Sequence, residues 1–374
     1  MAICSKVTRL ELRAWHDAVE ESIKQGLTHK LHNEAITAGN VHKWTFHHPG
    51  HGHPLVLQAP VLKNGKLRIM GTNRKHLKKN THGSATSGAR VLVLGRYLVH
   101  YSMLETFAES HNSPLLHSDI ISVDRQDDCA HAHLCSSAVI RQFSLLNELQ
   151  GQTGLVLYFW IAGETINAQQ SRTLSHLERM KILWWSQFFF DSWHQYVSDH
   201  LHYSVNTHFI TRELYDIISI FINVMLMLML IHQYFLPEIP LLHWLSSTEI
   251  CEHFFGCTWK IQKDFTFIEW SLMIPKLVLL IAGEFKTKGF QTKSSKHCSG
   301  YHHLWFEVIG INIINLATYT SDSEIQGVID VAFKEAMPLL SILGIENFTS
   351  GSIKDIGPQL AEVLAVMQPF LHTS

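Results

Sequence analysis

Two glutamates three residues apart, Glu249 and Glu252, are the strongest candidates for chemistry in this 374-residue sequence. The segment around them favours a helix, because Ser247 or Thr248 can cap its start, and residues i and i+3 share one helical face. Two carboxylates on one face suit Mg2+ coordination, provided that other carboxylates converge on them from elsewhere in the fold. A helix cap plus a surface acid explains the same spacing equally well.

A second acidic group, Asp124-Arg-Gln-Asp-Asp128, comes just before an expected helix. The simpler interpretation is capping and a favourable interaction with the helix dipole. The alternative is a divalent-metal or polar-network site. His131, His133 and Cys135 follow closely, but residues i and i+2 of a helix do not share a face, which argues against zinc.

Positive charge is concentrated in one part of the chain. The net charge is −2, yet residues 35–104 contain ten Lys or Arg and no Asp or Glu, so this segment carries +10 and the remainder −12. Such a segment is a candidate surface for nucleic acid, and the alternative is a solvated basic face. The candidate phosphate contacts are Arg74, Lys75, His76, Lys78, Lys79 and Arg90.

The elements that must position these residues are mostly helical. Hydrophobic residues are 46% of the chain and charged residues 17%, which is enough apolar material for a sizeable core. Strands are expected at 54–60 and 66–71, joined by a turn at Asn64-Gly65, after a His-rich loop at 47–54 that we interpret as exposed rather than metal-binding. The expected helices are 124–147, 154–168, 175–200, 209–235, 247–258, 264–284, 322–343 and 357–371, besides a short one within 1–34.

The predicted fold is mainly α with a small α/β part. The expected divisions are 1–53, a short helix and the His-rich loop; 54–150, the α/β part; 151–246, a helical region; and 247–374, a carboxyl-terminal helical part. Ser175 and Glu178 predict a capping box, and Pro275 should kink or end its helix.

The most apolar run, residues 217–231, is fifteen residues long, shorter than the ~20 that a membrane span requires. We therefore expect a buried core helix and no membrane partner. Thr8-Arg-Leu-Glu-Leu-Arg13 interrupts any apolar start, which favours an intracellular protein, nuclear or cytoplasmic. The sequence leaves the oligomeric state open.

Several blocks resemble one family. Ser247-Thr-Glu-Ile-Cys-Glu-His-Phe-Phe-Gly256 is similar to transposon-derived proteins of mushroom-forming fungi, and through them to P-element and THAP-type transposases, whose catalytic glutamate lies in a (D/E)-x-x-E-x-x-F-G helix. Other blocks in the same order are Thr72–His76, Ser87–Arg90, Asp124–Asp128, Gly163-Glu164 with Ser175–Arg179, and Phe209–Glu213.

The resemblance implies a partial RNase H-like core interrupted by a large helical insertion. In the family, three carboxylates hold two Mg2+ ions for DNA strand cleavage and transfer, and the insertion binds GTP in P-element transposase. Glu252 would be the third acid and a metal ligand, with Glu249 beside it. The second would fall at Asn73, where an aspartate is expected and a neutral amide stands.

The leading functional expectation is therefore a transposase-derived protein that is catalytically inactive and retains some binding of DNA. One alternative is an active Mg2+-dependent nuclease or strand transferase that uses Glu252 with Asp124 or Asp128. Another is a helical protein-interaction scaffold without nucleic-acid function. If the resemblance holds, Asn73 and Glu252 should lie close in space.

Overall fold

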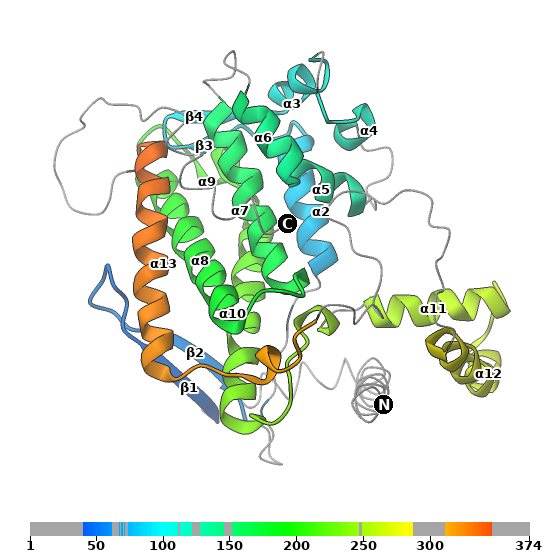
Figure 1. The fold of residues 1–374 in the computed structure, drawn as a ribbon. Helices are drawn as coiled ribbons and strands as arrows, with labels where there is room; N and C mark the ends of the chain where they lie inside the picture. The colour runs from blue at the N-terminus through cyan, green and yellow to red at the C-terminus, as the bar shows by residue number, and fades with distance from the viewer. Residues whose placement is uncertain are drawn as a thin grey trace.

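A computed structural model describes residues 40–61, 67, 69, 71, 74–110, 113–121, 128–145, 152–246, 249–286 and 311–345. These residues form a mainly helical body with two small antiparallel hairpins, and a separate helical hairpin beside it (Figure 1). The mainly α prediction with a small β-containing part is confirmed. The expected helices 1–34 and 357–371 lie outside the described residues.

The body is built around α8 (His176–Asp199), against which α7 (Thr153–Gln170), α10 (Arg212–Phe235) and α13 (Asp322–Leu343) pack. All four match expected helices to within about three residues. The Ser175–Glu178 capping box is confirmed. Buried residues occur on every side of α8, because a helix surrounded by other helices needs no polar face.

Aromatic side chains fill the space around α8. Trp193 is fully buried, and its indole nitrogen donates a 2.6 Å hydrogen bond to the carbonyl of Val93. Its ring meets Phe209 edge-to-face at 4.4 Å, a favoured geometry for aromatic pairs. This indole therefore joins the helical core to the short β3 strand.

Helix α10 contains the most apolar run. By length and composition it is the one described helix that could cross a membrane, and half of its most apolar window is buried inside the protein. Its buried side chains follow the helical period along one face, from Leu214 through Ile218 and Ile222 to Met229. That pattern agrees with the expected core helix.

The first hairpin pairs β1 (Val41–Phe46) with β2 (Leu55–Pro60), and Trp44 faces Leu57 on its buried side. Strand β1 was not expected from the sequence. The His-rich loop connects the two strands, so the expected boundary between residues 53 and 54 crosses this hairpin. His48 packs edge-to-face on Phe188 and Phe333, at 5.2 and 5.6 Å.

The second hairpin pairs β3 (Leu92–Leu94) with β4 (Tyr97–Val99). Gly95 in its turn has a φ of 61°, and a Cβ there would lie 1.9 Å from the carbonyl oxygen of Leu343. The backbone N–H of Arg96 donates to that same oxygen at 2.8 Å. Only glycine fits this position, where the carboxyl end of α13 touches the turn.

The described residues do not show the expected RNase H-like core. Their only sheets are the two antiparallel pairs. At the expected strand 66–71 they show a single bridge, between Val61 and Leu67. The expected helix 124–147 is two helices, α5 (Asp128–Leu134) and α6 (Ser137–Leu145). The remaining body elements are α2 (Arg74–Thr86), α3 (Tyr101–Ala108), α4 (His117–Ile120), α9 (Val205–His208) and the short helices η2 (His243–Leu245) and η3 (Asn315–Ala317).

The separate hairpin consists of α11 (Glu249–Ile261) and α12 (Phe267–Lys286), drawn to the right of the body in Figure 1. Its own small core comprises Phe254, Cys257, Met273, Leu277 and Ile281. Helix α12 continues through Pro275, so of the two expected outcomes, a kink or an end of the helix, the second was wrong. An exposed proline costs one backbone hydrogen bond without removing a core contact.

Candidate functional site

The predicted acidic site is only partly within the described residues. Glu249 and Glu252 occupy the first turn of α11, which confirms that a helix carries them. Asp128 is the first residue of α5. The side chains of these three acids, and all of Asn73 and Asp124, lie outside the described set. The expected proximity of Asn73 to Glu252 therefore stays a prediction.

Two of the predicted phosphate contacts have structural roles instead. The side chain of Lys78 is 2% exposed, so it cannot reach a DNA backbone without leaving the core. The Arg90 guanidinium donates to the carbonyl oxygens of Val205 and Phe209, at 3.2 and 3.1 Å. These bonds tie the start of β3 to α9, where a charge-assisted contact satisfies carbonyls at a helix end.

The other four predicted contacts lie on α2. Arg74, Lys75 and His76 form its first turn, and Lys79 follows one turn later, half-buried. No acidic residue occupies the first turn. A helix start carries partial positive charge, which adds to that of the basic side chains. The basic surface is therefore smaller than the sequence suggested.

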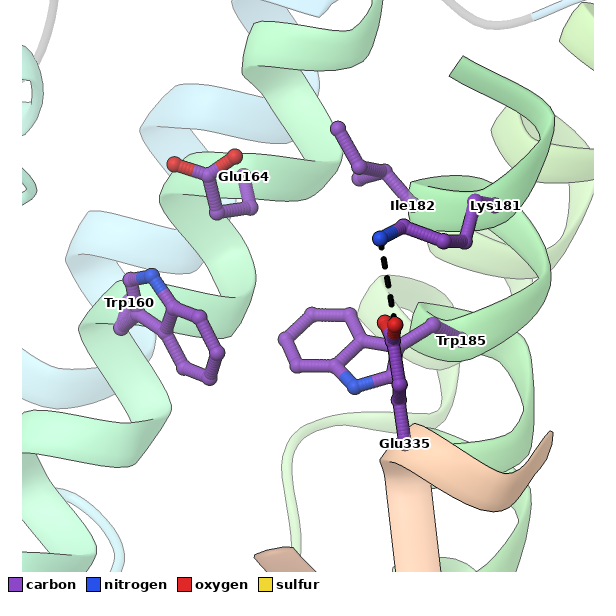
Figure 2. Close-up of a pocket in the computed structure, with 6 residues that line it drawn as sticks. All are labelled: Trp160, Glu164, Lys181, Ile182, Trp185 and Glu335. Carbon is purple, nitrogen blue, oxygen red and sulfur yellow. Dashed lines mark hydrogen bonds and ion pairs between the residues drawn. The ribbon is translucent and has the colours of Figure 1, made fainter. Parts of the chain in front are cut away.

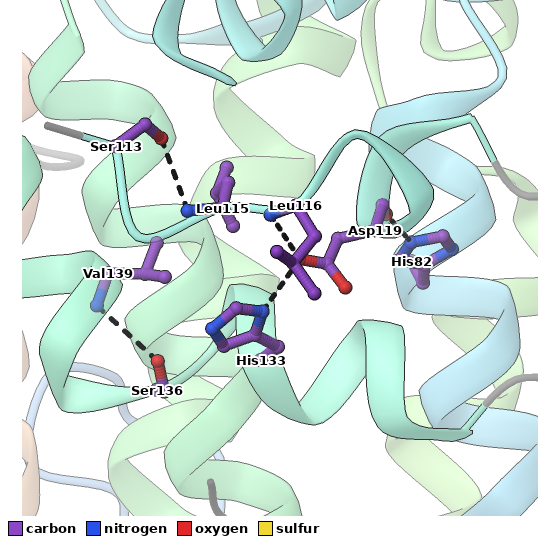
Figure 3. A network of polar contacts seen from close by, with 8 residues as sticks. All are labelled: His82, Ser113, Leu115, Leu116, Asp119, His133, Ser136 and Val139. Carbon is purple, nitrogen blue, oxygen red and sulfur yellow. Dashed lines mark hydrogen bonds and ion pairs between the residues drawn. The ribbon is translucent and has the colours of Figure 1, made fainter. Parts of the chain in front are cut away.

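Beside α2 lies a polar network centred on Asp119 of α4 (Figure 3). The Asp119 carboxylate accepts the backbone N–H of Leu116 at 2.7 Å and the Nδ1–H of His133 at 2.6 Å. The Nε2–H of His82 donates to the Asp119 carbonyl at 2.7 Å. The network therefore joins α4 to both α2 and α5.

A carboxylate–imidazole pair can orient a general base for a nucleophile. Hydrogen bonding to Asp119 raises the pKa of His133, as such a role would require. Among the described side chains, however, no hydroxyl or thiol hydrogen-bonds to the other ring nitrogen of His133. The pair therefore fits a structural link between α4 and α5 better than a catalytic dyad.

The imidazole of His131 in α5 and the thiol of Cys135 just after this helix are also structural. His131 is buried, and burial lowers its pKa well below the usual value. Burial raises the pKa of the Cys135 thiol to about 12, and its Sγ lies 3.5 Å from Nε2 of His131. His131 and His133 face different neighbours, as their spacing predicted. Within the described ranges, no three His, Cys, Asp or Glu side chains are grouped to bind a metal.

A small pocket opens between α7, α8 and α13 (Figure 2). Trp160 and Trp185 meet edge-to-face across it at 4.8 Å, and Lys181 pairs with Glu335 at 3.2 Å. Its empty volume of about 230 Å³ includes open solvent, and the enclosed space is only about 10 Å³, far below the ~300–1,000 Å³ typical of ligand pockets. A nucleotide is much larger than this space, so the pocket does not fit GTP.

Glu164 is the most perturbed acid in the body. Burial raises its pKa to about 7, although a hydrogen bond from Asn167 partly counters this effect. Figure 2 shows its carboxyl group turned away from Lys181. A carboxyl group that resists ionisation can act as a general acid, but the pocket has no room beside it for a substrate. We therefore assign it an effect on stability.

A buried histidine pair anchors the segment that leads into α11. His176 Nε2 lies 3.0 Å from the Leu316 carbonyl, which can only accept, so this nitrogen carries the hydrogen. His176 Nδ1 must then accept from Nε2 of His243, at 3.1 Å. Burial lowers the pKa of His176 to about 4, so the pair is neutral. These bonds hold η2, three residues before α11 begins.

The largest feature that sequence reasoning missed is an exposed apolar surface on α12. Leu272 is 76% exposed, Leu279 73% and Phe267 72%, and Ile268 and Val278 are exposed as well. We name these five residues the α12 surface. The sequence does indicate this surface. Apolar residues of α12 recur on two opposite faces of the helix, and α11 can cover only one of these faces.

Comparison with protein-family models, with curated proteins and with solved structures finds no match to this chain.

Proposed function

We propose that this chain is a transposase-derived protein that does not cleave DNA and acts as a helical protein-interaction scaffold. The α12 surface carries the proposal. Soluble proteins seldom leave several large apolar side chains contiguous and exposed, and such patches mark sites of association. The pocket between α7, α8 and α13 of the body, in contrast, is too small for a substrate.

The transposase origin and the loss of cleavage rest on the sequence. Glu249 and Glu252 stand in the helix that resembles the family's catalytic helix, but Asn73 replaces the second acid. An amide supplies one neutral oxygen ligand, which cannot replace the charge of a carboxylate beside two Mg2+ ions.

Photo-crosslinking tests the scaffold proposal. The benzophenone amino acid p-benzoylphenylalanine replaces Leu272 in one variant and Leu201, a 95% exposed residue of the body, in a matched control. Illumination of cells that express the chain should give a discrete protein adduct from position 272 and none from position 201. The absence of an adduct at 272, or equal labelling at both positions, would contradict the proposal.

A labelled-DNA cleavage assay with Mg2+ or Mn2+ tests the loss of catalysis. We expect no product above that of a Glu252→Ala control. Cleavage that depends on Glu252 would show an active nuclease, with Asp124 and Asp128 as the first candidates for the missing acids.

DNA binding by α2 is a second candidate function, favoured by the basic first turn of this helix and the absence of acids there. Lys75→Ala with Lys79→Ala should weaken binding to a labelled duplex and reduce its salt dependence by about one to two phosphate contacts. Lys334→Ala, at an exposed position of α13, is the matched control. Equal salt slopes in all three proteins would exclude α2 as the binding surface.

A further inference from the structure

We infer that the α12 surface binds a second copy of this chain, with the two α12 helices antiparallel about a two-fold axis. This inference rests on the scaffold proposal and names the partner. It follows from the spacing, charge and area of the exposed residues, each of which is compatible with self-association.

The residues of the exposed stripe of α12 have the same sequence intervals whether they are counted from the start or from the end of the helix. At 3.6 residues per turn, Ile268, Leu272, Pro275 and Leu279 lie within a stripe about 60° wide, opposite the residues that face α11. Their intervals of four, three and four are those of a helix-packing seam. Because these intervals are symmetric, an antiparallel copy places Ile268 against Leu279 and Leu272 against Pro275 of the second copy.

The residues beside the stripe are also complementary under the same two-fold axis. Glu269 and Lys276 both lie on one side of it, and in an antiparallel pair the same sides of the two helices meet. Glu269 of each copy then lies within about two residues of Lys276 of the other. Phe267 and Val278 are both exposed on the other side of the stripe. Phe267 of each copy then lies within about two residues of Val278 of the other. Opposite charges thus meet along one edge and apolar groups along the other.

The area available is adequate for a dimer. The α12 surface and Pro275 provide six exposed side chains on this face. If each presents roughly 100 Å2, one copy offers about 600 Å2 and a pair about 1,200 Å2, which is the lower end of the range for specific interfaces. Symmetric two-fold pairing is also the commonest form of protein self-association.

Light scattering and sedimentation of the purified full chain test the inference. We expect the mass of two copies at micromolar concentration, and the mass of one copy for Leu272→Glu with Leu279→Glu. Leu201→Glu, on the body, should remain dimeric. Circular dichroism of each variant checks that the helices still form, since these exposed positions lie outside the hairpin core.

A charge-reversal pair tests the geometry. Lys276→Glu and Glu269→Lys should each weaken self-association by roughly three- to tenfold, whereas a mixture of the two variants should associate about as tightly as the original chain. Glu269→Lys also loses the bond to the Thr266 backbone that caps α12, so recovery in the mixture is the decisive observation.

A monomeric chain at tens of micromolar, or a dimer unaffected by Leu272→Glu with Leu279→Glu, would overturn the inference. In that case an adduct to another protein at position 272 would leave the scaffold proposal standing, whereas the absence of any adduct there would remove both.

Discussion

The body and the α11–α12 hairpin contain similar apolar residues but use them differently. In the body, α8 is covered by α7, α10 and α13, and Trp193, Phe189 and Phe190 are completely enclosed. In the hairpin, five residues form the core, while residues as large as Phe267 and Leu272 face solvent. In the body, the apolar side chains are buried and stabilise the fold. On the hairpin, exposed apolar side chains can still be buried by association with another protein.

The two regions also differ in where their charged side chains lie. In the body, cationic side chains such as Lys78 and Arg90 are drawn into the packing. On α12, Glu269 and Lys276 remain at the surface beside the apolar stripe. An unpaired buried charge is costly, so a cation inside the body needs polar partners there. Exposed charges, in contrast, can determine which surfaces meet.

The largest expected effect is in the body. Trp193→Ala should lower the free energy of unfolding by about 4 kcal/mol, because it empties a large enclosed site and orphans the Val93 carbonyl. Urea unfolding measures this. Trp193→Phe keeps most of the packing and should cost clearly less. In the hairpin, Leu272→Ala should change the unfolding midpoint little, and equal losses at Trp193 and Leu272 would refute the contrast.

The next largest effect comes from a glycine of the body. Gly95→Ala should destabilise by roughly 3 kcal/mol, because its φ is positive and a Cβ would collide with the Leu343 carbonyl. Hydrogen exchange at the Arg96 amide should accelerate as that bond to α13 weakens. Stability close to that of the original chain would show that α13 is not fixed at this turn.

A smaller effect depends on pH and concerns Glu164. Its pKa of about 7 in the folded state exceeds its usual 4.5, so folding favours its protonated form, and the protein loses stability as the pH rises from 4.5 to 7. Glu164→Gln, which cannot ionise, should raise stability by about 1–2 kcal/mol at pH 8, allowing for partial exposure. Urea titrations should show this gain disappearing near pH 4.5, and a gain independent of pH would contradict the assignment.

The smallest effect has the opposite sign to that at Gly95. Gly256 lies within α11, and a Cβ there meets nothing within 4 Å. Gly256→Ala should therefore stabilise the hairpin by about 0.5–1 kcal/mol through helix propensity, detectable as slower exchange of α11 amides. Loss of stability would show that another chain or segment approaches this face closely.

Helical periodicity and capping residues predicted most of the fold. The expected helix 322–343 has the same bounds as α13, whose Ser321–Glu324 capping box and left-handed Gly344 mark its two ends. Strand β1 was missed because it is short and because His42 is polar, so that only Trp44 and Phe46 give its inward face an apolar character. Its existence depends on pairing with β2 across the His-rich loop, which local pattern does not reveal.

The candidate site was less predictable, because burial of charged groups is decided by tertiary packing. Lysine is rarely buried completely, and nothing near Lys78 in the sequence indicates that α5 and α2 pack together. The acids of α11 were placed correctly on a helix, since the capping residues before them indicate where a helix begins. The α12 surface could have been found only by asking which of two apolar stripes α11 was able to cover.

The position of α13 has a consequence for synthesis. One end of this helix exchanges two hydrogen bonds with the His47 backbone through Gln326, a pairing across 279 positions, and its other end meets the Gly95 turn. During translation, His47 and the Gly95 turn leave the ribosome long before α13 does. Until then the face of α8 around Phe188, which Phe333 later covers, has no partner from α13. This face of α8 therefore stays uncovered by α13 while the segment between α8 and α13 is synthesised, and an exposed apolar core is the state in which chaperones are most needed.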